Sequence, residues 1–213
     1  MVVVTNIING LTALGTIAVA VSAIWGDRLR SRFDPLELTM IKPTPMADPT
    51  TFSIFSPLTG SPPGTPGTRV MFYHLTVINR RRWRAAENCR VMLVGITRRD
   101  PANIFQPMAM PVPMQLVWAP AEITPPSITI TREQVLDLGF IVENDKNFIP
   151  RLYSTPNNFQ GYVGPNEAVR YHLQIEAVNF TSPIYVVEVA WDGQWSYDPT
   201  AMERHLPIRL NPT

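Results

Sequence analysis

Apolar and polar residues alternate along much of this chain, and a period of two predicts β-strands that bury one face. In the stretch 169–177 every second residue is apolar, and Arg170, His172, Gln174 and Glu176 lie between them. Similar runs cover 36–40, 71–79, 88–97 and 185–191, and weaker ones cover 115–118, 127–131, 148–153 and 205–210. Seven to nine short strands joined by turns predict an antiparallel, immunoglobulin-like β-sandwich.

Prolines separate these runs. The chain has 22 prolines, and two stretches, 43–66 and 101–126, hold seven each. Because proline removes a backbone donor and disfavours helix, both stretches are expected to be long connections. A capping box at 131–134 predicts a short helix through Leu138, and Asp198-Pro199 predicts another through Arg204. Asp192-Gly193 is a hairpin turn signal.

The N-terminal stretch has a different pattern. Residues 1–26 carry no charged side chain, and Arg28, Arg30 and Arg32 follow at once. A helix over this stretch would span about 36 Å, enough to cross a bilayer, so the pattern predicts a transmembrane helix. A cleaved signal peptide and a buried core helix are the alternatives. The predicted domains are a transmembrane helix at 1–26, a basic juxtamembrane linker at 27–35 and a β-sandwich domain at 36–213.

The three arginines also predict an orientation, because basic flanks stay on the cytoplasmic side. The expected location is the inner (cytoplasmic) membrane, with a single pass and a cytoplasmic C-terminal domain. Small residues recur along one face of the predicted helix and would let another membrane helix pack closely. These helix-packing residues are Thr12, Thr16, Ala20 and Ala23. A lone anchor with incidental small residues is the alternative.

Charge is distributed unevenly although the net charge is only +1, which argues against a dedicated nucleic-acid binder. Residues 1–100 carry 12 basic and 6 acidic side chains, and residues 101–213 carry 6 and 11. The basic half is the one nearest the predicted membrane, where anionic lipid headgroups would attract it. The single cysteine, Cys89, rules out an internal disulfide.

Residue types that carry chemistry are few and scattered. His74, His172 and His205 lie on different predicted elements, and no pair has the spacing of metal ligands. His74 and His172 would meet only if their strands are neighbours. Cys89 shares a face with apolar residues and is expected to be buried and inert. No catalytic or cofactor motif occurs, so we expect a protein that is not an enzyme and binds no cofactor or metal.

Two segments are candidates for contact with a partner or a membrane surface. The first is the basic turn Arg80, Arg81, Arg82, Trp83 and Arg84, which together with Arg28, Arg30 and Arg32 suits anionic headgroups or an acidic protein. The second is a proline-rich loop whose apolar residues would form an adaptable strip. Its contact residues are Phe105, Met108, Met110 and Met114. In both cases the alternative is a segment that folds back on the sandwich.

Three stretches carry a resemblance to a known class: 73–79, 86–91 and 189–195 with its continuation to Met202. In them the chain resembles a loose class of bacterial single-pass membrane proteins with an immunoglobulin-like domain. The resemblance implies an N-terminal span before a β-sandwich, and it implies no activity or site residue. In topology alone the layout is also similar to the H-type subunit of purple-bacterial reaction centres.

These observations favour a non-catalytic accessory or structural subunit that docks onto other membrane protein subunits through its helix and loops. Two alternatives stay open. The first is a membrane-anchored ligand- or peptide-binding sensor, with Trp83, Trp191 and Trp195 as candidate contacts. The second is a pilin-like or envelope fibre subunit, although arginines directly after the helix argue against a filament core.

Overall fold

The computed structural model describes residues 15–16, 19–20, 36–43, 46–52, 68–81, 83–110, 112–121, 123–145 and 147–211. The chain divides into two compact units, 1–37 and 38–213. Of 1–35, only Gly15, Thr16, Val19 and Ala20 are described, and all four are helical and exposed. The other residues of the predicted helix 1–26 and all of the linker 27–35 lie outside the described residues.

The expected fold class needs one correction, which concerns its N-terminal transmembrane helix. In the part of the chain that the structure describes, no helix is long and apolar enough to cross a membrane. The prediction relied on the absence of charge, which overstates how apolar the segment is. Polar residues and glycines interrupt it at Thr5, Asn6, Asn9, Gly10, Thr12, Gly15, Thr16 and Ser22.

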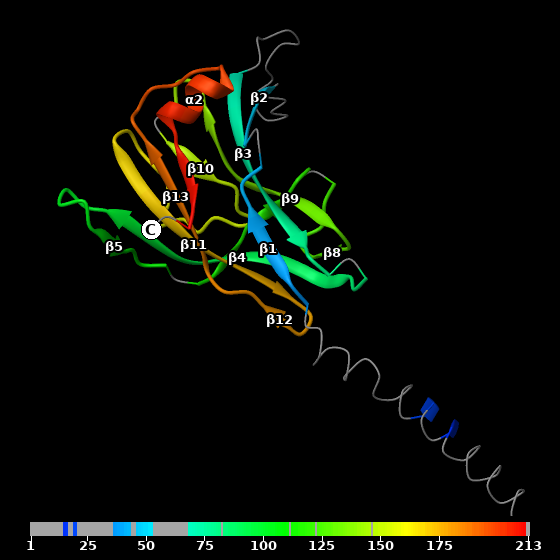
Figure 1. The fold of residues 1–213 in the computed structure, drawn as a ribbon. Coiled ribbons are helices and arrows are strands. Elements are labelled where there is room, and N and C mark those ends of the chain that lie inside the picture. The colour runs from blue at the N-terminus through cyan, green and yellow to red at the C-terminus, as the bar shows by residue number, and fades with distance from the viewer. Residues whose placement is uncertain are drawn as a thin grey trace, which may run out of the picture. The chain divides into compact units, whose positions relative to one another are not determined.

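The mainly β, antiparallel part of the expectation is confirmed, because the second unit consists of two antiparallel sheets (Figure 1). The first sheet has six strands in the order β1-β3-β9-β10, with β2 also paired to β3 and β7 to β9. These strands are β1 (Leu38–Ile41), β2 (Ala47–Phe52), β3 (Thr68–Asn79), β7 (Val117–Trp118), β9 (Glu133–Val142) and β10 (Phe148–Pro150).

The second sheet has eight strands in the order β14-β13-β11-β4-β5, with β12 also paired to β11 and both β6 and β8 to β4. Its long strands are β4 (Ala86–Arg99), β11 (Glu167–Ala177) and β13 (Tyr185–Trp191). The short ones are β5 (Phe105–Pro107), β6 (Met114–Gln115), β8 (Ile128–Ile130), β12 (Phe180–Thr181) and β14 (Ile208–Leu210). Strands β1, β3 and β9 are neighbours in that order in the first sheet, and β13, β11 and β4 are neighbours in that order in the second.

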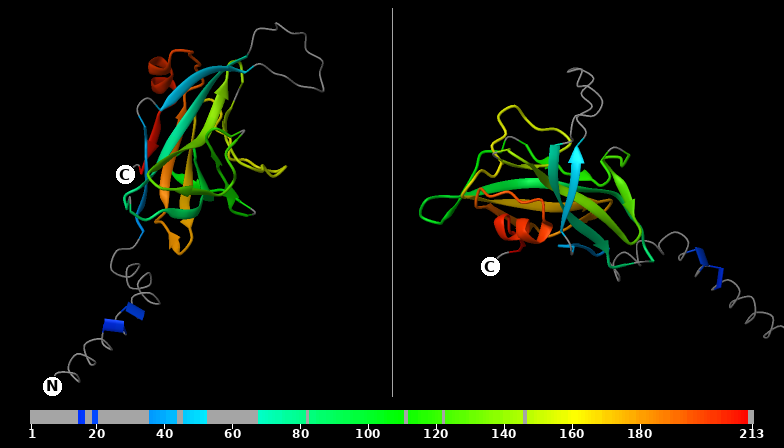
Figure 2. Two further views of the ribbon diagram at one scale, coloured as in Figure 1. Left: turned by 90° about the vertical axis from the view of Figure 1, so that its right-hand side faces the viewer. Right: turned by 90° about the horizontal axis from the view of Figure 1, so that it is seen from above.

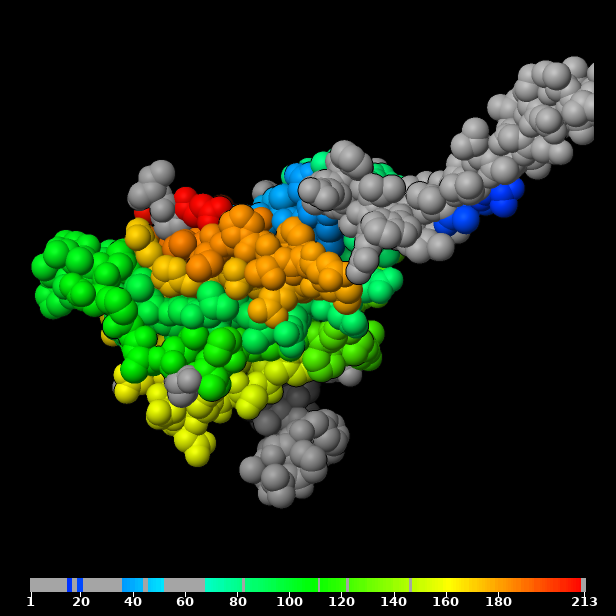
Figure 3. Space-filling view, turned by 90° about the horizontal axis from the view of Figure 1, so that it is seen from below, coloured from blue at the N-terminus to red at the C-terminus, as the bar shows by residue number. Residues whose placement is uncertain are grey.

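The alternation in β11 explains how the core forms. Val169, Tyr171, Leu173 and Ile175 are at most 1% exposed, and the polar residues between them are half-buried on the opposite face. Trp118 and Phe148 of the first sheet are also fully buried. Burying each such apolar side chain contributes about 1.5–3 kcal/mol. The long strands run through the body of the domain, while the β4–β5 hairpin projects from one side (Figures 2 and 3).

The predicted helix at 131–138 is wrong, because Glu133–Val142 is strand β9. Pairing with β3 along nine residues and burial of Leu136 and Leu138 outweigh the local capping signal. The prediction that both proline-rich stretches contain only connections is also wrong. Strand β2 includes Pro49 and pairs with β3 on one side only, so the missing N–H of the proline is tolerated there.

The helix predicted after Asp198 is confirmed as α2 (Pro199–His205), with Asp198 as its N-cap accepting the amides of Thr200 and Ala201. Asp192-Gly193 does form a turn, in which Gly193 has φ +92° and Asp192 accepts the amide of Gln194. It does not connect a hairpin, however. The strand that returns to β13 is β14, which follows α2.

Candidate functional site

The basic turn predicted at 80–84 connects β3 to β4, and the buried side chain of Asn79 organises it. Asn79 Nδ2 donates to the carbonyls of Arg84 at 2.6 Å and Ile130 at 3.0 Å, and its Oδ1 accepts the Arg81 amide at 2.9 Å. Asn79 is 1% exposed, so these bonds lie in a low-dielectric environment. The turn is therefore held in one conformation at its base.

The side chains of this turn face outward to different degrees. Trp83 is 56% exposed, which is high for an indole, and Arg80 is exposed while donating to Thr39 Oγ1 at 3.2 Å. Arg81 and Arg84 are half-buried, and Arg82 lies outside the described residues, as do Arg28, Arg30 and Arg32. The turn therefore presents an aromatic ring together with positive charge.

Two further exposed apolar residues lie at the same end of the domain. Leu38, the first residue of β1, pairs with Asn79 at the base of the turn, so β1 begins at this end of the domain. The amide of Val178 donates to the carbonyl of Glu87, three residues after the turn, and this bond brings Val178 to the same end. Val178 is 45% exposed and Ile184, on the other side of β12, is 53% exposed. The turn around β12 (orange) lies beside the start of β4 (teal) in Figure 3. We call the surface formed by Arg80, Arg81, Trp83, Arg84, Val178 and Ile184 the β1 end.

The proline-rich strip at 105–114 folds partly back on the second sheet. Met114 is 5% exposed in β6, and the ring of Phe105 lies 3.9 Å beneath the Arg170 guanidinium. The Arg98 Nε donates to the sulfur of Met108 at 3.5 Å, and Met110 is half-buried. Among the described residues of this region, the large apolar side chains that are exposed are instead those of Ile104 and Val112, at 56% and 57%. That the strip contacts a partner stays a prediction.

His74 and His172 do not meet, because His74 is on β3 of the first sheet and His172 on β11 of the second. His172 faces Thr97, whose Oγ1 is 3.5 Å from its Nε2. Burial, and then the positive charge of Arg170, lower the pKa of His172. Among the residues with described positions, no three His, Cys, Asp or Glu side chains gather as metal ligands would.

His74 instead belongs to a charged triad that sequence reasoning missed. Its Nδ1 lies 2.9 Å from Asp137 Oδ1, and Arg151 Nη1 lies 3.2 Å from Asp137 Oδ2. The Asp137 side chain is only 4% exposed, whereas those of His74 and Arg151 are each 22% exposed. The His74–Asp137 contact has the distance of an ion pair but not the direction of a good hydrogen bond.

This triad lies in a groove of about 650 Å³ beside the first sheet. The Arg151 guanidinium stacks 5.2 Å above the Phe72 ring, and Phe72 is stacked with His74 at 6.3 Å between centroids. Strand β2, strand β9 and the loop after β7 supply the remaining walls. Their lining residues are Asp48, Thr50, Thr51, Ala119, Pro120, Ala121 and Val135.

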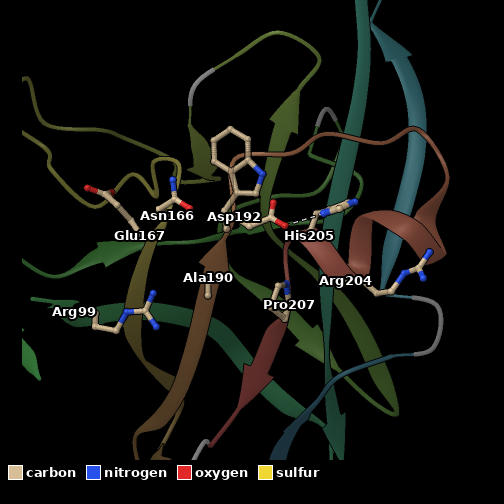
Figure 4. A pocket seen from close by; sticks show the side chains of 9 residues that line it. Arg99, Asn166, Glu167, Ala190, Asp192, Arg204, His205 and Pro207 are labelled. Atoms are coloured by element: carbon tan, nitrogen blue, oxygen red, sulfur yellow. Dashed lines mark hydrogen bonds and ion pairs between the residues drawn. The ribbon is translucent and has the colours of Figure 1, made fainter. Parts of the chain in front are cut away.

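A second cavity, of about 330 Å³, lies where β13 meets the end of α2 (Figure 4). Asp192 Oδ2 is 2.8 Å from His205 Nδ1, and Arg99 and Arg204 lie to either side of this pair in Figure 4. Partial burial acts to raise the pKa of Asp192, but the hydrogen bonds from His205 and Gln194 hold it below the usual aspartate value. The pair joins the end of α2 to β13, where the Asp192 amide also donates to the His205 carbonyl.

The other candidate residues on the β-sandwich are buried or make contacts within the fold. Trp191 is 4% exposed and donates its indole N–H to the Gln194 carbonyl at 2.8 Å, and Trp195 is stacked with Tyr197. Cys89 is fully buried as expected, and burial raises the pKa of its thiol to about 11. Of the predicted helix-packing residues, Thr16 and Ala20 are helical and exposed, while Thr12 and Ala23 lie outside the described residues.

No protein-family model matches the chain, and neither a curated protein nor a solved structure is significantly similar to it. The resemblance to bacterial single-pass membrane proteins therefore stays a prediction. A functional conclusion has to rest on the geometry of the domain itself.

Proposed function

We propose that this chain is a non-catalytic accessory subunit that docks onto a partner protein through the β1 end of its β-sandwich. The observation that carries the proposal is Trp83, whose ring is more than half exposed on a turn that Asn79 holds rigid. Tryptophan and arginine are the residue types most enriched among the energetically dominant contacts of protein interfaces. A pre-organised turn also loses little conformational entropy when it binds.

The charges of the β1 end indicate the chemistry of that partner. Arg80, Arg81 and Arg84 belong to the same turn as Trp83, and the exposed aliphatic residues Val178 and Ile184 lie at the same end of the domain. A complementary partner would present carboxylates around an apolar pocket that takes an indole ring. Such charge complementarity raises the association rate and selects among partners.

The test is co-purification of the tagged full-length chain from its native cells in a mild detergent, with partners counted by mass spectrometry. We expect a stoichiometric protein partner, and Trp83→Ser should reduce its recovery at least tenfold, as loss of a dominant contact does. Ile123→Ser is the matched control, because Ile123 is 80% exposed outside the β1 end and its loss should leave recovery unchanged.

Three outcomes would contradict the proposal. A chain recovered alone as a monomer would exclude an accessory subunit, and a chain that polymerises would favour the fibre alternative. Co-sedimentation with anionic phospholipid vesicles, lost in Trp83→Ser, without any protein partner would assign the β1 end to lipid headgroups instead.

A further inference from the structure

A small cavity beside α2 is lined by a buried tyrosine whose hydroxyl the fold does not use. The cavity has a volume of about 170 Å³ and lies where α2 and β14 meet the start of β2. Tyr73 of β3 lines it and is 2% exposed, and its hydroxyl has no hydrogen-bond partner among the described residues. A buried hydroxyl without a partner costs free energy, which a partner from outside the chain would recover.

The surroundings of Tyr73 indicate that its hydroxyl faces α2. The ring packs edge-on against Phe148 in the core, with 5.8 Å between the ring centroids. Glu203 of α2 lines the same cavity, and α2 lies beside β2 in Figures 1 and 2. Burial, and then the negative charge of Glu203, raise the pKa of Tyr73. The hydroxyl therefore keeps its proton at neutral pH and can donate a hydrogen bond into the cavity.

The other walls indicate an uncharged ligand with an apolar body. Met46, Leu206 and Ile208 line the cavity and are at most 5% exposed. The two charged lining residues pair with each other, because Lys42 Nζ lies 2.6 Å from Glu203 Oε1. Their side chains are 32% and 58% exposed, so the pair lies on the solvent side of the cavity. A charged ligand would compete with this pair, whereas an uncharged one leaves it intact.

The volume limits the size of the ligand, since an apolar cavity of about 150 Å³ holds one benzene molecule. We propose that this cavity binds a small uncharged molecule with an apolar body the size of one benzene ring and an oxygen atom that accepts a hydrogen bond from Tyr73. Where that oxygen itself carries a proton, the exposed hydroxyl of Thr200 on the cavity wall is a second polar group for it. No lining residue of the cavity belongs to the β1 end, so either proposal can fail without the other.

The test is a calorimetric titration of the purified full-length chain with phenol and with toluene, which has the same shape but no oxygen. We expect saturable binding of phenol by the wild type. Tyr73→Phe should weaken phenol binding about fivefold relative to toluene binding, which corresponds to the loss of one hydrogen bond. In a parallel NMR titration with phenol, the methyl resonances of Met46 and Leu206 should shift, while those of Val178 at the β1 end should not.

Two controls separate binding from folding. Tyr153→Phe also removes a hydroxyl, which donates to the Thr124 carbonyl at 3.1 Å outside the cavity, and it should leave phenol binding unchanged. Tyr73→Phe should unfold at the same urea concentration as the wild type or a higher one, because it removes an unpaired buried group. No saturable binding of phenol would show that the cavity holds only water and would overturn the proposal. An equal effect of Tyr73→Phe on phenol and toluene would overturn the role of the hydroxyl.

Discussion

Each of the two sheets carries a nearly buried carboxylate between two basic side chains, but the two clusters are built differently. On the second sheet Arg170, Glu188 and Arg209 lie in register on three adjacent strands, with Glu188 2.8 Å from Arg170 and 3.7 Å from Arg209. This cluster is open to water on one side, because Arg209 is 66% exposed.

On the first sheet the carboxylate lies deeper and its partners are more enclosed. Asp137 is 4% exposed against 11% for Glu188, and His74 and Arg151 are each 22% exposed beside the groove. In both clusters an arginine stacks on a phenylalanine, Arg151 on Phe72 and Arg170 on Phe105. A carboxylate, two basic side chains and a phenylalanine therefore form a solvated cross-strand ladder on one sheet and a partly enclosed cluster on the other. Enclosure is the feature that sets the two clusters apart.

The largest expected effect comes from removing one arginine from each cluster. Arg151→Met should lower the free energy of unfolding by about 3 kcal/mol, because it leaves Asp137 buried with His74 as its remaining partner. Arg170→Met should cost only about 1 kcal/mol, since water and Arg209 still solvate Glu188. Urea denaturation of both variants measures the difference, and equal losses would show that enclosure does not distinguish the two clusters.

A pair of glycines tests the packing of the two sheets in the same way. A Cβ at Gly139 of β9 would lie 2.5 Å from both the Ile149 carbonyl oxygen and the Phe148 ring. Gly139→Ala should therefore destabilise the domain by about 2 kcal/mol through overpacking.

Gly95 of β4 is the matched position on the second sheet. A Cβ there would lie no closer than 3.5 Å to any neighbour, and that neighbour is His172. Gly95→Ala should change the free energy of unfolding by less than about 0.5 kcal/mol, or raise it slightly through the lower entropy of the unfolded chain. Thermal unfolding of the two variants measures this contrast, and a stable Gly139→Ala protein would contradict the close packing of β9 on β10.

The two sheets also differ in how far the sequence predicts them. The second sheet follows from its alternation, because β11 and β13 have regular apolar positions on one face. The first sheet was harder to predict, since β2 contains a proline and β9 begins with a helix-capping pattern. Tertiary pairing with β3 decides both cases, and no local pattern reveals it.

The candidate site was missed for a related reason. Asp137 lies between Leu136 and Leu138, and a charged residue flanked by buried leucines in a strand would have signalled an unusual environment. With 131–138 interpreted as a helix, that signal was lost. The exposed basic turn at 80–84, by contrast, was located from sequence because it depends only on the two strands that flank it. The partners of Asp137 come from β3 and from the segment after β10, and their meeting depends on the whole sheet.

The smallest effect that we expect concerns pH and the histidine of the second sheet. Burial and Arg170 lower the pKa of His172 in the folded protein, so near pH 6 the unfolded chain binds more protons at this residue than the folded chain does. Stability should therefore fall as the pH drops from about 7 through the range between the unfolded and the folded pKa. His172→Gln removes this contribution, and its free energy of unfolding should decline less between pH 7 and pH 5 than that of the wild type. Urea denaturation at a series of pH values measures both slopes, and parallel curves would show that the histidine is equally easy to protonate in the folded and unfolded states.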